Sequence, residues 1–257
     1  MIMKNKYDGI LILSDIDGTL VHNRILSEET ENAVRDFVSQ GGKFSVATGR
    51  TPQYIKDNYQ NRIAINAPIA AINGAVVASF EPMELIHGAV LPEDFKKVVY
   101  RIWSLVETER VMAYTFKETI KLEKDFESTL KDDAYKLLAV TQSEKDALFL
   151  RDTLREEFSD EYSIMRSWNT GVEVIRKDAG KGMCLEKIKE ITKSKITIGI
   201  GDYENDITLI KSADIGIATE NAVDELKEYA DIVAVSSDKH PVKQVIENLE
   251  EIIKKLS

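Results

Sequence analysis

An apolar segment near the N-terminus ends abruptly in two acidic residues, and this junction constrains the chain more than any other feature. The run from Ile10 to Leu13 has the character of a buried strand, and Asp15 and Asp17 follow it after one serine. Residues i and i+2 of a strand share a face, so the two carboxylates are expected side by side at the strand's carboxyl end. Neighbouring carboxylates repel each other and are costly to desolvate, which indicates a bound cation or a chemical task.

The overall charge excludes some partners. The chain of 257 residues carries 44 acidic and 34 basic side chains, for a formal charge of -10. An acidic excess argues against nucleic acid or an anionic membrane as the main partner. It does not exclude a small anionic substrate, because a bound metal and a few local cations set the potential inside a site. With 43% hydrophobic residues the chain can bury a real core, in one large or two ordinary domains.

Cysteine usage and hydropathy bear on the cellular compartment. Cys184 is the only cysteine, which excludes a disulfide framework and a cysteine metal site and suits a reducing cytosol. The uncharged stretch from Ile63 to Phe80 has the length of a membrane span. Turn-forming residues interrupt it, and two buried strands joined by a hairpin at Asn73-Gly74 explain it better. We expect a cytoplasmic protein that contacts no membrane and is a monomer or a weak homodimer.

Strand and helix patterns alternate along the first and last thirds of the chain, which is typical of a parallel sheet covered by helices. Strands are predicted at 10–14, 43–47, 69–72, 75–80, 195–200, 214–218 and 231–235. Helices are predicted after Ser27 and Thr51, over 180–192 and 204–212, and from Pro241 onward. We therefore expect an α/β fold with a doubly wound, mostly parallel, Rossmann-like core sheet.

The middle third has a different pattern, without the regular βα alternation. Strands are predicted at 84–90, 111–116, 119–122, 135–140 and 162–167, with helices opening at Pro92 and spanning 143–158. This mixture predicts a small α+β module inserted into the core. The expected division is a core of residues 1–81 and 178–257 and an inserted module of residues 82–177.

Four short polar segments carry the residue types of phosphoryl transfer. They are Asp15–Thr19, Thr48-Gly49-Arg50, Lys181-Gly182 and Gly201–Asp206. Each alone occurs often in structural roles, but three of the four follow the carboxyl end of a predicted strand, where open α/β sheets bind ligands. A carboxylate such as Asp15 can form an aspartyl-phosphate. Asp15 and Asp202 supply the oxygen ligands that Mg²⁺ prefers, and Thr48 and Lys181 can orient phosphate oxygens.

Together these segments resemble the motifs of haloacid dehalogenase superfamily phosphatases, specifically the Cof-like branch with a large α/β cap between the second and third motifs. The resemblance covers essentially the whole chain. The matching segments are Ser14–Leu20, Ala47–Arg50, Lys181-Gly182 and Gly201–Asp206, with Ile72–Ala75 resembling the stretch before the cap. Two stretches depart from the branch's pattern, Thr219-Glu220 and Asp238-Lys239, and these affect loop shape rather than catalytic positions.

The resemblance implies a role for each matching residue. Asp15 attacks phosphorus, and Asp17 protonates the leaving alcohol and then activates water. Mg²⁺ is held by the Asp15 carboxylate, the Asp17 backbone carbonyl and Asp202, while Asp206 orients the metal's waters or supports Asp202. The implied phosphate- and substrate-binding residues are Thr48, Gly49, Arg50, Lys181 and Asn205. Asp17 needs a proton at the start of its cycle, and we expect burial among neighbouring acids to favour its protonated form.

These implications predict a Mg²⁺-dependent phosphomonoesterase acting on a small phosphorylated metabolite such as a sugar phosphate. Two alternatives stay open, a phosphosugar mutase and a phosphate-binding regulatory protein of receiver type. Several further residues have candidate positions near the active-site mouth: Trp168 and Asn169 at the end of the cap, Glu173 just after the cap strands, and His22 in the loop after the first motif.

Overall fold

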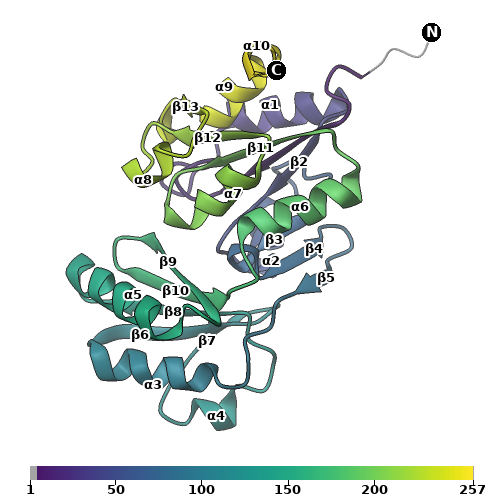
Figure 1. Ribbon diagram of the computed structural model, residues 1–257. Helices are drawn as coiled ribbons and strands as arrows, with labels where there is room; N and C mark the ends of the chain where they lie inside the picture. The colour runs from purple at the N-terminus through teal and green to yellow at the C-terminus, as the bar shows by residue number, and fades with distance from the viewer. Residues whose placement is uncertain (1–4, 257) are drawn as a thin grey trace.

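The computed structural model describes residues 5–256, and its core is built on a five-stranded parallel sheet (Figure 1). The strand order is β13-β12-β11-β1-β2. The bounds are β1 Ile10–Ser14, β2 Lys43–Val46, β11 Ile196–Gly201, β12 Ile215–Thr219 and β13 Ile232–Ala234. In the register, Ser14 pairs with both Ile200 and Val46, so β1, β11 and β2 end at one edge of the sheet. The residues that follow these strands are therefore neighbours.

Helices cover both faces of this sheet. On one face lie α1 (Glu28–Ser39), α9 (Pro241–Glu247) and α10 (Leu249–Leu256), and on the other lie α6 (Lys181–Thr192) and α7 (Ile207–Ser212). Strand β1 is buried from both sides because Ile10 and Ile12 pack into one apolar cluster and Leu11 and Leu13 into the other. Alternate side chains of a strand point to opposite faces, which explains the continuous apolar run in the sequence. The predicted doubly wound α/β class is confirmed.

The helix ends follow their sequence signals. Ser27 caps α1 by accepting a hydrogen bond from the Thr30 amide, and Thr51 caps α2 (Pro52–Tyr59) through the Tyr54 amide. The C-terminal segment contains two helices instead of the single predicted one, because the chain leaves helical geometry at Asn248. The predicted helix at 204–212 begins as a 3-10 turn over Glu204–Asp206, and a short helix α8 (Asp224–Lys227) follows β12.

The predicted hairpin at Asn73-Gly74 is confirmed. Strands β3 (Ile69–Ala71), β4 (Val76–Ser79) and β5 (Glu84–Gly88) form an antiparallel sheet, and a parallel bridge between Ala47 and Ala70 joins it to the end of β2. Gly74 has φ +83°, and a Cβ there would lie 2.1 Å from the carbonyl carbon of Gly180, so the turn lies tightly against the start of α6. Within residues 5–256, no helix has both the length and the apolar character that crossing a membrane requires.

The inserted module is a second, antiparallel sheet with helices on one side (Figure 1). Its strand order is β7-β6-β8-β10-β9. The bounds are β6 Thr108–Tyr114, β7 Thr119–Lys121, β8 Lys136–Thr141, β9 Tyr162–Trp168 and β10 Gly171–Arg176, with helices α3 Phe95–Leu105, α4 Phe126–Thr129 and α5 Glu144–Phe158. Residues such as Leu137 and Val174 pack against α3 and α5. The residues that alternate with them along β8 and β10 therefore point to the other side of this sheet, toward the parallel-sheet core. The exact division at residues 82 and 177 stays a prediction. Strand β5 lies within the range predicted for the module, but it pairs with β4, which lies in the range predicted for the core.

Candidate active site

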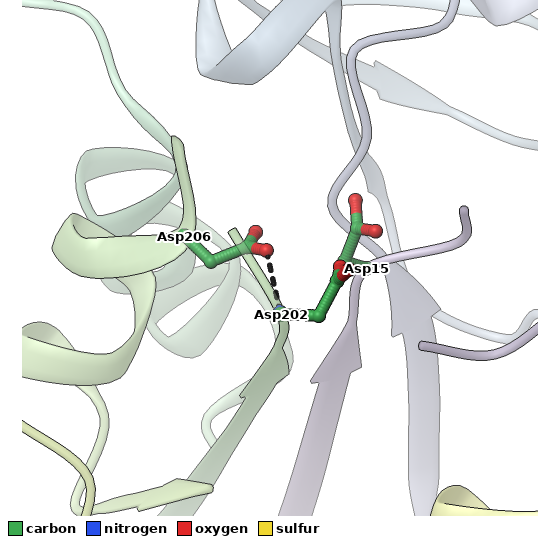
Figure 2. A group of neighbouring side chains, drawn as sticks. All are labelled: Asp15, Asp202 and Asp206. Atoms are coloured by element: carbon green, nitrogen blue, oxygen red, sulfur yellow. Dashed lines mark hydrogen bonds between the residues drawn. The ribbon is translucent and has the colours of Figure 1, made fainter. Parts of the chain in front are cut away.

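Three acidic side chains meet at the carboxyl edge of the parallel sheet (Figure 2). Asp15 follows β1, Asp202 follows β11, and Asp206 ends the 3-10 turn after it. One oxygen from each carboxylate lies within 4.8 Å of the others. Asp206 is fully buried, and its Oδ2 accepts hydrogen bonds from the amides of Asp202 at 2.9 Å and Tyr203 at 3.2 Å. Asp206 thus fixes the turn that presents Asp202.

Lys181, the first residue of α6, joins two of these acids. Its fully buried Nζ donates to Asp15 Oδ1 at 2.7 Å and to Asp206 Oδ1 at 2.5 Å. Burial alone would lower the pKa of Lys181, but the two carboxylates outweigh burial and raise it. Lys181 therefore stays charged, and it fixes the carboxylate of Asp15 from one side.

The cluster still carries an excess of negative charge. Burial raises the pKa of Asp15 well above its usual range, although Lys181 opposes this shift. Burial, followed by repulsion from Asp206, raises the pKa of Asp202 to about 7. Within the described chain, Oδ2 of Asp15 and Oδ2 of Asp202 accept no hydrogen bond. A largely buried, electron-rich group of three carboxylates is a donor set that suits a hard divalent cation such as Mg²⁺.

Gly18 makes room for Asp202. Its φ is +87°, and a Cβ at this position would lie 2.3 Å from Asp202 Oδ2. The backbone of the first motif therefore lies against the carboxylate of the fourth, which only glycine permits.

Asp17 lies nearer the mouth of the site. Its carboxylate accepts a bidentate pair of hydrogen bonds from Arg50, at 2.9 Å from Nε and 3.0 Å from Nη2. Its side chain is 40% exposed, so the expectation that Asp17 is buried among neighbouring acids is wrong. The reason is the turn at Gly18, which leaves Asp17 on the open side of the strand end while Asp15 points inward.

A cavity of about 720 Å³ opens above these residues, between the core and the cap. The sequence-predicted residues that line it are Asp15, Asp17, Thr48, Gly49, Arg50, Asp202 and Asn205. Lys181 and Asp206 do not line it, because both are buried behind the carboxylates of the other two acids. The first, second and fourth motifs thus line one space, and the third contributes Lys181 behind Asp15.

Cap residues complete the cavity, and a buried cap residue that contacts three of the lining residues, Gly49, Tyr114 and Glu173, was not predicted. Lys136 on β8 is fully buried, and its Nζ donates to the Gly49 carbonyl at 2.9 Å and to Glu173 at 2.7 Å. Burial lowers the pKa of Lys136, and Glu173 opposes this. A single lysine inside an otherwise apolar strand was the available signal, since lysine is rarely fully buried unless paired.

Glu173 lies within β10 and not just after the cap strands, and it joins the cap to the core. It accepts hydrogen bonds from Ser167 at 2.9 Å and from Asn73, whose Oδ1 in turn accepts from Asn205 at 3.0 Å. One polar chain therefore runs from the cap to the fourth motif.

Glu204 forms a second connection between cap and core. Its side chain is only 4% exposed, and its carboxylate accepts from Arg166 Nε at 2.7 Å and from Arg151 at 3.0 Å. The Arg166 amide, on edge strand β9, also donates to it at 3.3 Å. Next to it, the Tyr203 hydroxyl donates to Asn169 at 2.8 Å. The turn that carries two of the site's acids is therefore held by the cap.

Of two other residues that the sequence placed near the active-site mouth, one lines the cavity and the other does not. Trp168 lines the cavity and is 38% exposed. His22 does not line it, and its Nδ1 lies 3.0 Å from Ser237 Oγ, in a contact between two loops.

The fold and the site together define a hydrolase of the haloacid dehalogenase type. The model of the haloacid dehalogenase-like hydrolase family matches residues 12–121 and 106–246, so the chain belongs to this family. Its curated relatives include the phosphatase YwpJ and the putative phosphatase YxeH of Bacillus subtilis, and the chain is a phosphatase of the Cof-like branch.

Individual relatives are distant but extend over nearly the whole chain. The 5-amino-6-(5-phospho-D-ribitylamino)uracil phosphatase YcsE of Bacillus subtilis is 24% identical, with 95% of this chain and 97% of the relative covered. Phosphoglycolate phosphatase 2 of Saccharolobus solfataricus is 28% identical, with 93% and 92% covered. A haloacid dehalogenase-like hydrolase structure from B. subtilis has a TM-score of 0.80 at 22% identity, with 93% and 99% covered, which supports the fold.

Proposed function

We propose that this phosphatase is a Mg²⁺-dependent phosphomonoesterase that hydrolyses a small phosphorylated metabolite, such as a sugar phosphate, through a phosphorylated Asp15. The observation that carries the proposal is the position of Lys181, which binds Asp15 and Asp206 on one side and leaves Oδ2 of Asp15 available on the other. A fixed carboxylate with one available oxygen is suited to attack a phosphorus atom.

The surrounding residues would hold the phosphoryl group. Thr48, Gly49 and Asn205 line the cavity beside Asp15, and Lys181 supplies a buried positive charge. Donors that are fixed before the reaction stabilise charge that develops on the phosphoryl oxygens. The carboxylates of Asp15 and Asp202 and the backbone carbonyl of Asp17 would hold Mg²⁺, which would neutralise further charge on the phosphate.

We propose that Asp17 moves the proton. It lines the cavity at its open side, where a leaving alcohol and later a water molecule would enter. Arg50 holds both of its oxygens, so we propose that Arg50 orients Asp17 toward the substrate and that substrate binding rearranges this ion pair. Once this ion pair is broken, Asp17 would take up a proton from solvent and give it to the leaving alcohol. It would then accept a proton from the water that hydrolyses the aspartyl-phosphate, which restores its starting state after release of that proton.

The names of the relatives agree with a small phosphorylated substrate. One is described as a ribitylaminouracil phosphatase and another as a phosphoglycolate phosphatase, and a structural neighbour is described as a sugar phosphatase. These substrates differ from one another, so they support the reaction class and not one metabolite.

The test is phosphate release from p-nitrophenyl phosphate and a panel of sugar phosphates, with Mg²⁺ and with a chelator. Asp15→Asn should abolish release, while Asp160→Asn, which removes an exposed cap carboxylate, should leave it unchanged. Acid-quenched Asp17→Asn protein should carry a phosphoryl group detectable by mass spectrometry.

A normal rate in Asp15→Asn would overturn the proposal. Isomerisation of a sugar phosphate without phosphate release would favour a mutase, and a phosphorylated wild-type protein that persists for minutes would favour a receiver.

A further inference from the structure

We infer that the natural substrate is an elongated phosphomonoester, with an apolar or heteroaromatic middle and a second anionic group at the end remote from the phosphate. This inference rests on the proposed function. The second anion, a carboxylate or another phosphate, would be bound by Arg110 of the cap.

The length of strand β6 sets the distance between the phosphate end of the cavity and Arg110. Arg110, Met112 and Tyr114 alternate along it, and all three line the cavity. Their spacing matches the period of two that places side chains on one face of a strand. At about 3.4 Å per residue, the Cα atoms of Arg110 and Tyr114 are about 14 Å apart.

Tyr114 marks the phosphate end of this strand. Its ring centroid lies 3.9 Å from Nζ of Lys136, and the same Nζ donates to the Gly49 carbonyl of the second motif. Arg110 therefore lies at the end of the cavity's strand face that is remote from the second motif. A ligand with its phosphate at Asp15 must extend past Met112 to reach Arg110.

The same sheet face gives the cavity apolar surface. Met112 pairs with Leu138 across the sheet, and both line the cavity. Glu173, the neighbour of Leu138 on β10, also lines it, and its carboxylate is paired with Lys136. The partly exposed Trp168 lines the cavity in the row of Arg110, beyond Val140 and Gly171. The volume of about 720 Å³ falls in the range that accommodates drug-sized ligands. Thioether, aliphatic and indole surfaces suit a flat ring better than a polyol.

The charges that line the cavity show why a second anion fits. Arg50 is hydrogen-bonded to Asp17, whereas Arg110 forms an ion pair with the neighbouring Glu109 at 4.0 Å, which is beyond hydrogen-bond distance. Arg24, from the core, also lines the cavity and forms no ion pair with any residue between 5 and 256. Asn23 and Arg24 have φ values of +49° and +65°, an uncommon conformation for two successive non-glycine residues. Guanidinium groups without close partners at a cavity wall bind carboxylates and phosphates in bidentate geometry.

A matched pair of substrates tests the inference: biphenyl-4-yl phosphate, and the same compound with a carboxylate at the 4′ position. In wild-type protein the carboxylate should lower KM about tenfold. Arg110→Gln should remove this advantage and leave kcat and the KM of the uncharged compound unchanged. Lys121→Gln removes a positive charge from β7, at a residue that does not line the cavity, and should preserve the advantage.

The outcomes separate the inference from the proposed function. Equal KM values for the two compounds in wild-type protein, or an equal rise of both KM values in Arg110→Gln, would overturn the inference and leave the phosphatase intact. If neither compound nor p-nitrophenyl phosphate released phosphate, the proposed function would fail and the inference with it.

Discussion

Glu204 accepts a 2.7 Å hydrogen bond from Arg166, and this pair connects the fourth motif to the edge strand of the cap. The two residues are 38 positions apart in the sequence: Arg166 lies on β9 of the cap sheet, and Glu204 lies in the 3-10 turn that follows β11 of the core. Because Glu204 lies between Asp202 and Asp206, the position of the cap and the position of two acids of the site depend on the same turn. Cap closure over a phosphoryl-transfer site excludes water, so this connection bears on catalysis as well as on stability.

Glu204→Gln should weaken this connection while keeping the size of the side chain. Arg166 and Arg151 would lose a charged acceptor, and we expect the free energy of unfolding to fall by about 1–3 kcal/mol. The matched control is Glu144→Gln, because Glu144 also pairs with Arg166 but its side chain is 51% exposed. It should cost less than about 1 kcal/mol. Denaturant unfolding measures both, and equal losses would contradict a special role for the buried pair.

Lys136→Met should be more damaging, because it leaves the carboxylate of Glu173 without its cation. The side chains of the pair are 1% and 2% exposed, and breaking such a buried pair costs about 3–5 kcal/mol. Adding Glu173→Leu to Lys136→Met should recover more than half of the loss, since no buried charge then remains. Denaturant unfolding of the two variants provides the comparison. A double variant no more stable than Lys136→Met would show that packing, and not charge, dominates at this position.

The stability of the metal-free protein should decrease as the pH rises through neutrality. Burial raises the pKa of Asp202 to about 7, whereas an unfolded chain has the ordinary value of 3.8. The folded state therefore binds this proton more tightly, so the associated stability is complete below pH 3.8 and is lost as the pH rises through about 7. In the presence of a chelator, we expect the free energy of unfolding to fall by about 2 kcal/mol between pH 5.5 and pH 8.

Two comparisons check the origin of this pH dependence. Asp202→Asn has no proton to lose and should show a flatter profile over the same range. Mg²⁺ should stabilise the wild-type protein more at pH 8 than at pH 5.5, because metal binding requires ionised carboxylates. Unchanged profiles in the variant would assign the dependence to another group.

The sequence was sufficient to predict the strands and turns of the core, because the sequence patterns that specify them are local. An apolar run followed by Asp15 and Asp17 predicts a strand end, and the Asn73-Gly74 pair predicts the observed hairpin. The contacts of Lys136 could not be predicted in the same way. Its partner carbonyl belongs to Gly49, 87 residues earlier, and periodicity shows which face of a strand a residue occupies but not what lies opposite. The pairing of Asp17 with Arg50 was missed for the same reason.

Gly18 and Gly9 form a matched pair that separates backbone strain from damage to the site. Their φ values are +87° and +83°, so alanine at either position should cost about 1–2 kcal/mol of stability. Only at Gly18 would the new methyl group lie 2.3 Å from Asp202 Oδ2, whereas at Gly9 the nearest atom is the flexible Lys195 Cδ at 3.4 Å. A displacement of Asp202 by about 1 Å is enough to reduce the rate about a hundredfold. We therefore expect Gly18→Ala to lose about a hundredfold in kcat with p-nitrophenyl phosphate and to bind Mg²⁺ more weakly by calorimetry. Gly9→Ala should keep both properties, and a similar loss of kcat in the two variants would show that backbone strain alone is responsible.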